Sequence, residues 1–230
     1  MNDGNLLLLK EKLRYMGFGE TVASSDRLET EIQKGTVEFQ LKTAACFDEW
    51  STIEATLFFC KSDNFGLYSF TKYDALLYYD EGGSPSKRRT FHIKNGNGVT
   101  FKEAYNLLQG RAVYTTLWNT DNLKYSAWIQ LSFSERTRDN TNYRVRQFGE
   151  NYGYNLEKVL KTYPIRELQD EKLKMNLLYS LQKGNVHPVT FIKANKIEKL
   201  FVEACPASKG LKIYSEAIWA IQKGSGKRIK

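Results

Sequence analysis

The sequence predicts an α+β protein built from three tandem units, each a helical segment followed by an antiparallel β-meander. The main observation is a glycine that recurs at nearly equal intervals, at Gly35, Gly110 and Gly184. Each glycine ends a helix-like segment and is followed at once by a β-like run, within three closely similar stretches: 32–37, 108–113 and 181–186. One supersecondary unit that is used repeatedly leaves this kind of pattern.

The similarity continues beyond the glycines. Residues 53–60 resemble 197–204, and residues 66–70 resemble 210–214 at the same offset, so the first and third units are the most alike. The middle unit lacks an obvious leading helix and carries a polar insertion at 134–142, between its second and third strands. The predicted boundaries follow from these matches. They are 1–94 for the first unit, 95–150 for the second, 151–222 for the third and 223–230 for a basic tail.

The helices are predicted by apolar residues at helical spacing. These residues form four groups: Leu6, Leu9, Leu13 and Met16; Leu28 and Ile32; Phe101, Ala104, Tyr105 and Leu108; and Leu156, Val159, Leu160 and Tyr163, followed by Leu168, Leu173, Leu177, Leu178 and Leu181. Thr100 and Glu103 have the spacing of a capping box before the third group. Each recurring glycine fits the left-handed position that follows the last helical turn, where a side chain is penalised.

The strands are predicted by alternating runs and by runs rich in aromatic and β-branched residues. The runs are 37–41, 52–60, 67–70, 75–79, 113–118, 125–133, 143–148, 189–193, 197–204 and 211–221. Short polar turns such as 63–66 and 193–196 join neighbouring runs, and turns of that length connect antiparallel strands. Each small sheet is expected to present one face to its own helix and to leave the other for water or a neighbour.

Composition indicates one folded chain without a membrane-spanning segment. Of the 230 residues, 41% are hydrophobic and 13% aromatic, which is too rich in packing side chains for disorder. No apolar run approaches the length of a transmembrane helix, so no membrane partner is predicted. The three cysteines are irregularly spaced, as is typical of a reducing compartment, and a cytoplasmic location is predicted.

No catalytic constellation emerges from the sequence, so the chain is predicted not to be an enzyme and to carry no cofactor or metal. His92 and His187 have no ligand partners at zinc-site spacing. There is no Gly-x-Ser-x-Gly nucleophile elbow. The Gly96-Asn97-Gly98 stretch precedes a helix but lacks the remaining residues of a phosphate loop, which favours a tight turn.

A family resemblance lies in four segments: 99–113 (VTFKEAYNLLQGRAV), 125–131 (YSAWIQL), 152–157 (YGYNLE) and 181–186 (LQKGNV). They resemble an uncharacterised family of proteins from anaerobic gut bacteria, often found near conjugative or other mobile DNA. The resemblance extends over roughly residues 9–214. It implies a bacterial protein that works around DNA transfer, and it carries over no catalytic or binding residue.

The excess of basic over acidic residues is the one broad indication of function. Thirty-four Lys and Arg residues against 26 Asp and Glu residues give a formal net charge of +8, and a field of that sign attracts polyanions such as DNA or RNA. Arg144 and Arg146 are spaced so that both point to one side of a strand, with Tyr143 and Val145 on the other. The predicted nucleic-acid-binding residues are Arg144, Arg146, Arg88, Arg89, Arg136 and Arg138, with Arg136 and Arg138 in the adjoining loop.

An alternative accounts for the same residues without nucleic acid. Arginines on the solvated face of an antiparallel sheet are ordinary, and a basic C-terminal tail can serve solubility alone. In that interpretation the small sheets offer edges or apolar patches to another protein, and the chain is an interaction or scaffolding module.

Overall fold

The computed structural model describes residues 3–19, 22, 26–63, 66–79, 86–94, 96–139, 141–194 and 196–225. Helices and three antiparallel sheets make up an α+β fold, as predicted. The chain divides into two compact units, Met1–Tyr105 and Asn106–Lys230. Each of the three predicted sequence units contains one of the sheets, and their boundaries at 94 and 150 stay predictions.

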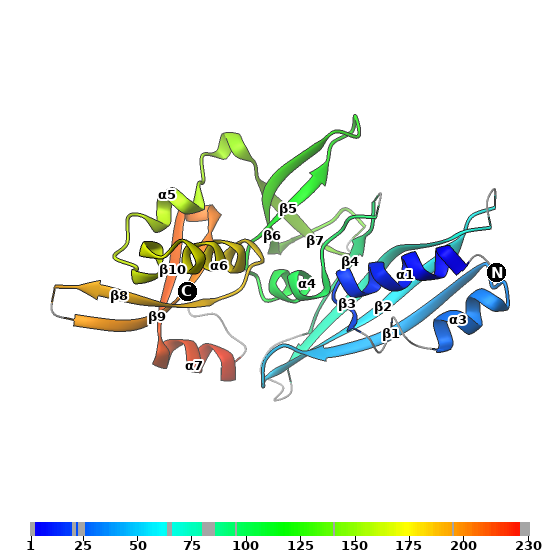
Figure 1. Cartoon of the computed structure of the whole chain (residues 1–230), viewed down its shortest axis with the longest axis horizontal. Helices are drawn as coiled ribbons and strands as arrows, with labels where there is room; N and C mark the ends of the chain where they lie inside the picture. Colours follow the sequence, from blue (N-terminus) through cyan, green and yellow to red (C-terminus); the bar gives the residue numbers. More distant parts are fainter. Residues whose placement is uncertain are drawn as a thin grey trace. The chain divides into compact units, whose positions relative to one another are not determined.

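The first compact unit is a four-stranded meander with helices (Figure 1). Its elements are α1 (Asp3–Tyr15), α3 (Asp26–Gln33), β1 (Glu38–Cys46), β2 (Ser51–Lys61), β3 (Tyr68–Tyr79), β4 (Lys87–His92) and the start of α4 (Phe101–Leu108). Neighbouring strands pair antiparallel in the order β1-β2-β3-β4, so every connection is a hairpin. This topology keeps all pairing local in the sequence.

One face of this sheet is buried, because apolar residues alternate along its strands. Ile53, Ala55 and Leu57 on β2 are almost fully buried, and the residues between them are more exposed. The predicted helical stripe of α1, including Leu13 and Met16, is buried as well. Alternation of period two in the strands and the helical period in α1 together give each element one apolar face.

The N-terminus of α4 is held by the predicted capping box. The Glu103 carboxylate accepts a hydrogen bond from the Thr100 amide at 2.8 Å, and the Glu103 amide donates to the Thr100 hydroxyl at 3.3 Å. The Phe101 amide donates to the Met16 carbonyl at 2.8 Å, which ties the start of α4 to the end of α1. These bonds satisfy amides that a helix start otherwise leaves without partners.

The second compact unit carries two three-stranded meanders, in the orders β5-β6-β7 and β8-β9-β10. The strands of the first are β5 (Val113–Trp118), β6 (Lys124–Arg136) and β7 (Tyr143–Phe148). Those of the second are β8 (His187–Lys193), β9 (Lys196–Cys205) and β10 (Gly210–Ser215). Between and after them lie α5 (Leu156–Leu160), α6 (Glu171–Gln182) and α7 (Glu216–Ser225), with short 3-10 turns at Glu150–Tyr152, Arg166–Gln169 and Pro206–Ser208.

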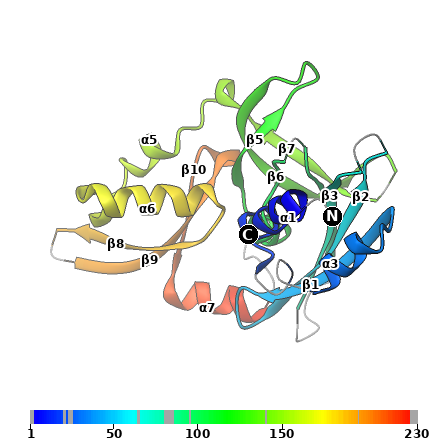
Figure 2. The same ribbon diagram turned by 45° about the vertical axis from the view of Figure 1, so that its right-hand side comes forward.

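The interior of the second unit joins its helices to both of its sheets. Leu177 and Leu181 of α6 are fully buried, in one cluster with Trp128 of β6 and Val202 of β9. On the other face of the β8–β10 sheet, Trp219 of α7 stacks on Phe201 at a ring separation of 5.9 Å. The helices α6 and α7 therefore cover opposite faces of this sheet (Figure 2).

The three recurring glycines adopt the predicted left-handed conformation, with φ of +71° at Gly35, +79° at Gly110 and +77° at Gly184. Each follows a helix and is followed within a few residues by the first strand of a meander. The helix, glycine and meander order therefore recurs three times along the chain.

Three sequence-based predictions are corrected. The runs 67–70 and 75–79 form one strand, β3, which passes a register shift on its pairing with β2. The run 211–221 is a short strand followed by helix α7, because the Ser215 hydroxyl accepts a hydrogen bond from the Ile218 amide at 3.4 Å and starts a helix there. Of the predicted tail at 223–230, residues 223–225 belong to α7 and residues 226–230 lie outside the described residues.

Candidate nucleic-acid interface

Arg144 and Arg146 stand on the same side of β7, as their spacing predicts. Their side chains are 65% and 55% exposed, whereas Tyr143 is buried and Val145 is half-buried on the other side of the strand. In a pleated strand, residues two apart share one face. The two guanidinium groups are therefore neighbours on a solvated surface.

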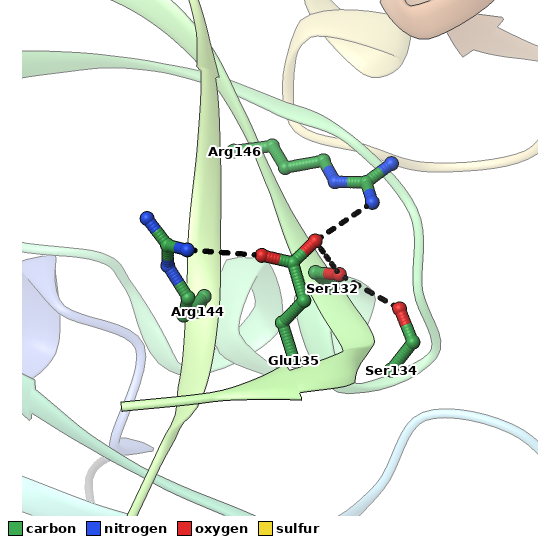
Figure 3. A network of polar contacts seen from close by, with 5 residues as sticks. All are labelled: Ser132, Ser134, Glu135, Arg144 and Arg146. Atoms are coloured by element: carbon green, nitrogen blue, oxygen red, sulfur yellow. Dashed lines mark hydrogen bonds and ion pairs between the residues drawn. The ribbon is translucent and has the colours of Figure 1, made fainter. Parts of the chain in front are cut away.

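A single carboxylate joins these two arginines (Figure 3). Arg144 donates from Nη1 to Oε2 of Glu135 at 3.2 Å, and Arg146 donates from Nη2 to Oε1 of the same side chain at 3.0 Å. The buried Ser132 hydroxyl also donates to Oε1 of Glu135, at 3.1 Å, and lies 3.2 Å from the Ser134 hydroxyl. The carboxylate is thus held between two guanidinium groups, and the buried Ser132 hydroxyl fixes its orientation.

A bulge in β6 brings Glu135 to this face. In the pairing of β6 with β7, Ser132 lies opposite Arg144, but the next paired residues are Arg136 and Tyr143. Three residues of β6, 133–135, are therefore inserted against none of β7. Because an odd number of extra residues reverses the alternation of a strand, Glu135 turns toward the arginines, where regular pairing would place it with Leu131 on the opposite face.

The charges of this cluster reinforce one another. The pKa of the Glu135 carboxyl lies below its ordinary value, first because of the hydrogen bond from Arg146 and then because of the one from Ser132. The carboxylate is therefore ionised at neutral pH. Two guanidinium charges and one carboxylate charge leave the cluster with one net positive charge.

Arg136 and Arg138 do not extend this pair. Arg136 lies in the last position of β6, not in the predicted loop, and its guanidinium sits 3.8 Å from the centre of the Tyr143 ring, on the face opposite Arg144 and Arg146. Arg138 is exposed in the loop between β6 and β7. The hairpin therefore presents basic side chains on both of its faces, with a fixed pair on one of them.

Arg88 and Arg89 belong to the first compact unit, on β4. As neighbours in one strand they point to opposite faces. Arg88 is exposed, while Arg89 lies 5.8 Å from the centre of the Phe91 ring, and burial lowers the pKa of its guanidinium. The two residues do not form a pair like that of Arg144 and Arg146.

Exposed rings accompany the basic hairpin. Phe133, in the bulge, is partly exposed and packs edge-on against Tyr143 at a centroid distance of 4.8 Å. Tyr125 of β6 is also partly exposed and donates from its hydroxyl to Gln147 at 2.9 Å. Both rings lie on the face of the hairpin that carries Tyr143 and Arg136, opposite Arg144 and Arg146.

Sequence reasoning missed two members of the cluster, Glu135 and Ser132. Both lie at or beside the predicted polar insertion, and their positions depend on the three-residue bulge. Their nearness to the arginines in the chain was the available signal, since a short hairpin brings residues on either side of its loop together.

Neither a protein-family model, nor a curated protein, nor a solved structure matches the chain. In the part of the chain that the structure describes, no helix is both long and apolar enough to span a membrane. Within the same residues, no three His, Cys, Asp or Glu side chains gather as metal ligands would.

Proposed function

We propose that this protein is a non-enzymatic accessory protein that binds nucleic acid through the hairpin of β6 and β7. The observation that carries the proposal is the pair of exposed guanidinium groups of Arg144 and Arg146, fixed side by side on one strand face. Guanidinium groups match phosphate oxygens in geometry as well as in charge, and paired ones follow a phosphate backbone. The resemblance to proteins near mobile DNA gives the proposal its biological setting.

Two further features support single strands as the preferred form. Phe133 and Tyr125 offer partly exposed rings on the face of this hairpin that carries Arg136, opposite Arg144 and Arg146, and single-strand binders combine basic side chains with rings on which bases stack. The formal net charge of +8 adds a long-range attraction that any polyanion would experience. The expected binding is therefore salt-dependent and tolerant of sequence.

The test is fluorescence anisotropy with a labelled oligothymidylate of about 15 nucleotides, which spans a typical single-strand site, over sodium chloride from about 50 to about 200 mM. Replacing both Arg144 and Arg146 with Ala is expected to weaken binding and to flatten its salt dependence. The double variant Lys193→Ala/Lys199→Ala removes the same charge from exposed positions on the β8–β9 hairpin and serves as the control.

Two results would contradict the proposal. One is an absence of binding by the wild-type protein even at the lowest salt. The other is an equal loss in the arginine variant and in the lysine control, because that would reflect net charge and no local site. Melting temperatures of both variants should stay close to that of the wild type, since all four side chains are exposed.

The alternative function, a protein-interaction module, is favoured by one observation. Helix α6 exposes Met175 and Tyr179, one helical turn apart on the same face, with more than half of each residue accessible. Large apolar side chains grouped on a surface mark interaction sites more often than chance. If this function holds, Met175→Glu would abolish association with a partner protein, and the arginine variant would leave that association unchanged.

A further inference from the structure

We propose that Glu135 is a built-in competitor for the arginine pair, so that a phosphate group binds Arg144 and Arg146 by displacing this carboxylate. The inference rests on the proposed function and concerns its regulation. In the structure, the carboxylate occupies the place between the two guanidinium groups that a bridging phosphate would take (Figure 3). Carboxylate and phosphate oxygens accept the same charge-assisted hydrogen bonds from arginine.

The geometry uses both oxygens of the carboxylate. Oε2 accepts from Arg144 at 3.2 Å, and Oε1 accepts from Arg146 at 3.0 Å and from Ser132 at 3.1 Å. Ser132 is buried, so its hydroxyl holds the carboxylate in one orientation from inside the hairpin. The three donors converge on the two oxygens of one carboxylate, which makes them a ready-made set for two oxygens of one phosphate group once the carboxylate has left.

The position of Glu135 in the chain allows it to leave. Its side chain is 40% exposed, and it lies in the 133–135 bulge, outside the paired residues of β6 and β7. Rotation of the side chain into water therefore breaks no bond of the strand ladder. Departure of the carboxylate also changes the net charge facing the ligand from one positive charge to two.

The strength of the contact suits a competitor that can be displaced. Exposed ion pairs change an equilibrium by a factor of about five or less each. A lone phosphate must replace the carboxylate, and its contacts with the arginines are little stronger than those that it displaces. Binding of a lone phosphate is therefore disfavoured. A polynucleotide has additional phosphates for the other basic residues of the hairpin, so its binding is weakened but not prevented.

The experiment compares Glu135→Gln with the wild type in the oligothymidylate anisotropy assay described above. The amide keeps the size of the side chain and an oxygen that can accept from Ser132, but it lacks the charge that holds both arginines. We expect affinity to rise about 3- to 10-fold at about 50 mM salt. The slope of log affinity against log salt should steepen by up to about 0.7, the value for one more neutralised phosphate on a single strand.

Matched variants separate the local effect from net charge and from folding. Glu150→Gln makes the same charge change at an exposed residue two positions beyond β7 and should raise affinity by less than about 2-fold. Glu135→Asp keeps the charge and shortens the side chain, so its affinity should lie between those of the wild type and Glu135→Gln. If Glu135→Gln is unstable, Glu135→Asp is compared with the wild type in its place. Glu135→Gln in the Arg144→Ala/Arg146→Ala background should give no more gain than Glu150→Gln, because the groups that it releases are gone.

The outcomes distinguish the competitor from the proposed function itself. Equal affinity of Glu135→Gln and Glu150→Gln overturns the competitor, and the proposed function then still stands if the arginine variant binds more weakly. Arginine-dependent binding by Glu135→Gln, together with no binding by the wild type, supports the competitor and contradicts the proposed function of the unmodified chain. Absence of binding by both proteins at the lowest salt overturns both.

Discussion

Replacement of Gly184 by alanine is expected to destabilise the second compact unit far more than the same replacement at Gly153. Both glycines have a left-handed backbone, with φ of +77° and +78°. They differ in the space around them. A Cβ atom at Gly184 would lie 2.8 Å from the Ala112 carbonyl oxygen and 2.9 Å from Cγ2 of Val113, whereas a Cβ atom at Gly153 would meet only the flexible end of Lys209, at 3.8 Å.

The close approach at Gly184 has a structural cause. Asn106, at the C-terminal end of α4, is fully buried and donates from Nδ2 to the Lys183 carbonyl at 2.7 Å and to Oδ1 of Asn185 at 2.9 Å. These bonds fix the residues on both sides of Gly184 to the end of α4, beside the start of β5. The backbone there cannot move aside for a side chain without breaking them.

The magnitude follows from two contributions. A left-handed alanine costs about 1 to 2 kcal/mol at either position. Crowding against fixed backbone atoms at Gly184 adds about 1 to 3 kcal/mol, for a total of about 2 to 5 kcal/mol. The effect of alanine on the unfolded chain is the same in both variants, so it cancels from the comparison.

Urea denaturation followed by circular dichroism measures the free energy of unfolding of each variant. Gly184→Ala should lose about 1 to 3 kcal/mol more than Gly153→Ala, with similar m-values. Equal losses would refute the reasoning, because they would mean that the left-handed backbone accounts for the whole effect and that the contacts around Gly184 adjust freely.

Three further predictions concern single contacts. The Asp139 carboxyl should titrate with a pKa of about 2, chiefly because Thr137 donates a hydrogen bond to it, and Thr137→Val should raise that pKa in an NMR titration; an unchanged value contradicts the assignment. Tyr105→Phe should cost about 1 kcal/mol at neutral pH, because the Tyr105 hydroxyl donates to Asp48. The pKa of Asp48 lies below its ordinary value in the folded protein, so this cost should shrink in urea titrations as pH falls below about 4, and a cost independent of pH would count against it. Leu177→Ala should lower the free energy of unfolding by about 3 kcal/mol, since the side chain is fully buried, and a loss under about 1 kcal/mol would mean that the core collapses around the gap.

Local periodicity was enough to predict most elements. The predicted runs at 113–118 and 143–148 coincide with β5 and β7, and the capping box at Thr100 and Glu103 is formed. Helix α7 escaped prediction because its apolar residues are nearly continuous, a pattern shared by buried strands and helices. A contact distant in sequence, between the rings of Trp219 and Phe201, accompanies the helical form.

For the candidate site, too, only the features that depend on local strand geometry could be predicted from the sequence. The shared face of Arg144 and Arg146 follows from strand geometry alone. The participation of Glu135 does not, because it depends on how many residues of β6 go unpaired. No residue type in the segment 133–135 dictates that number, which is set by the pairing of the whole hairpin.

The pairing of Arg136 with Tyr143 has a consequence for descent by insertion and deletion. Because paired residues share a face, the residue before Arg136 lies on the surface of the two cations for as long as this pair is kept, whatever the length of the bulge. Loss of one or two amino acids from 133–134 would therefore leave the acidic group beside them. Related chains could vary in length at this spot and keep their electrostatic self-neutralisation, which replacement of the single acidic residue would remove.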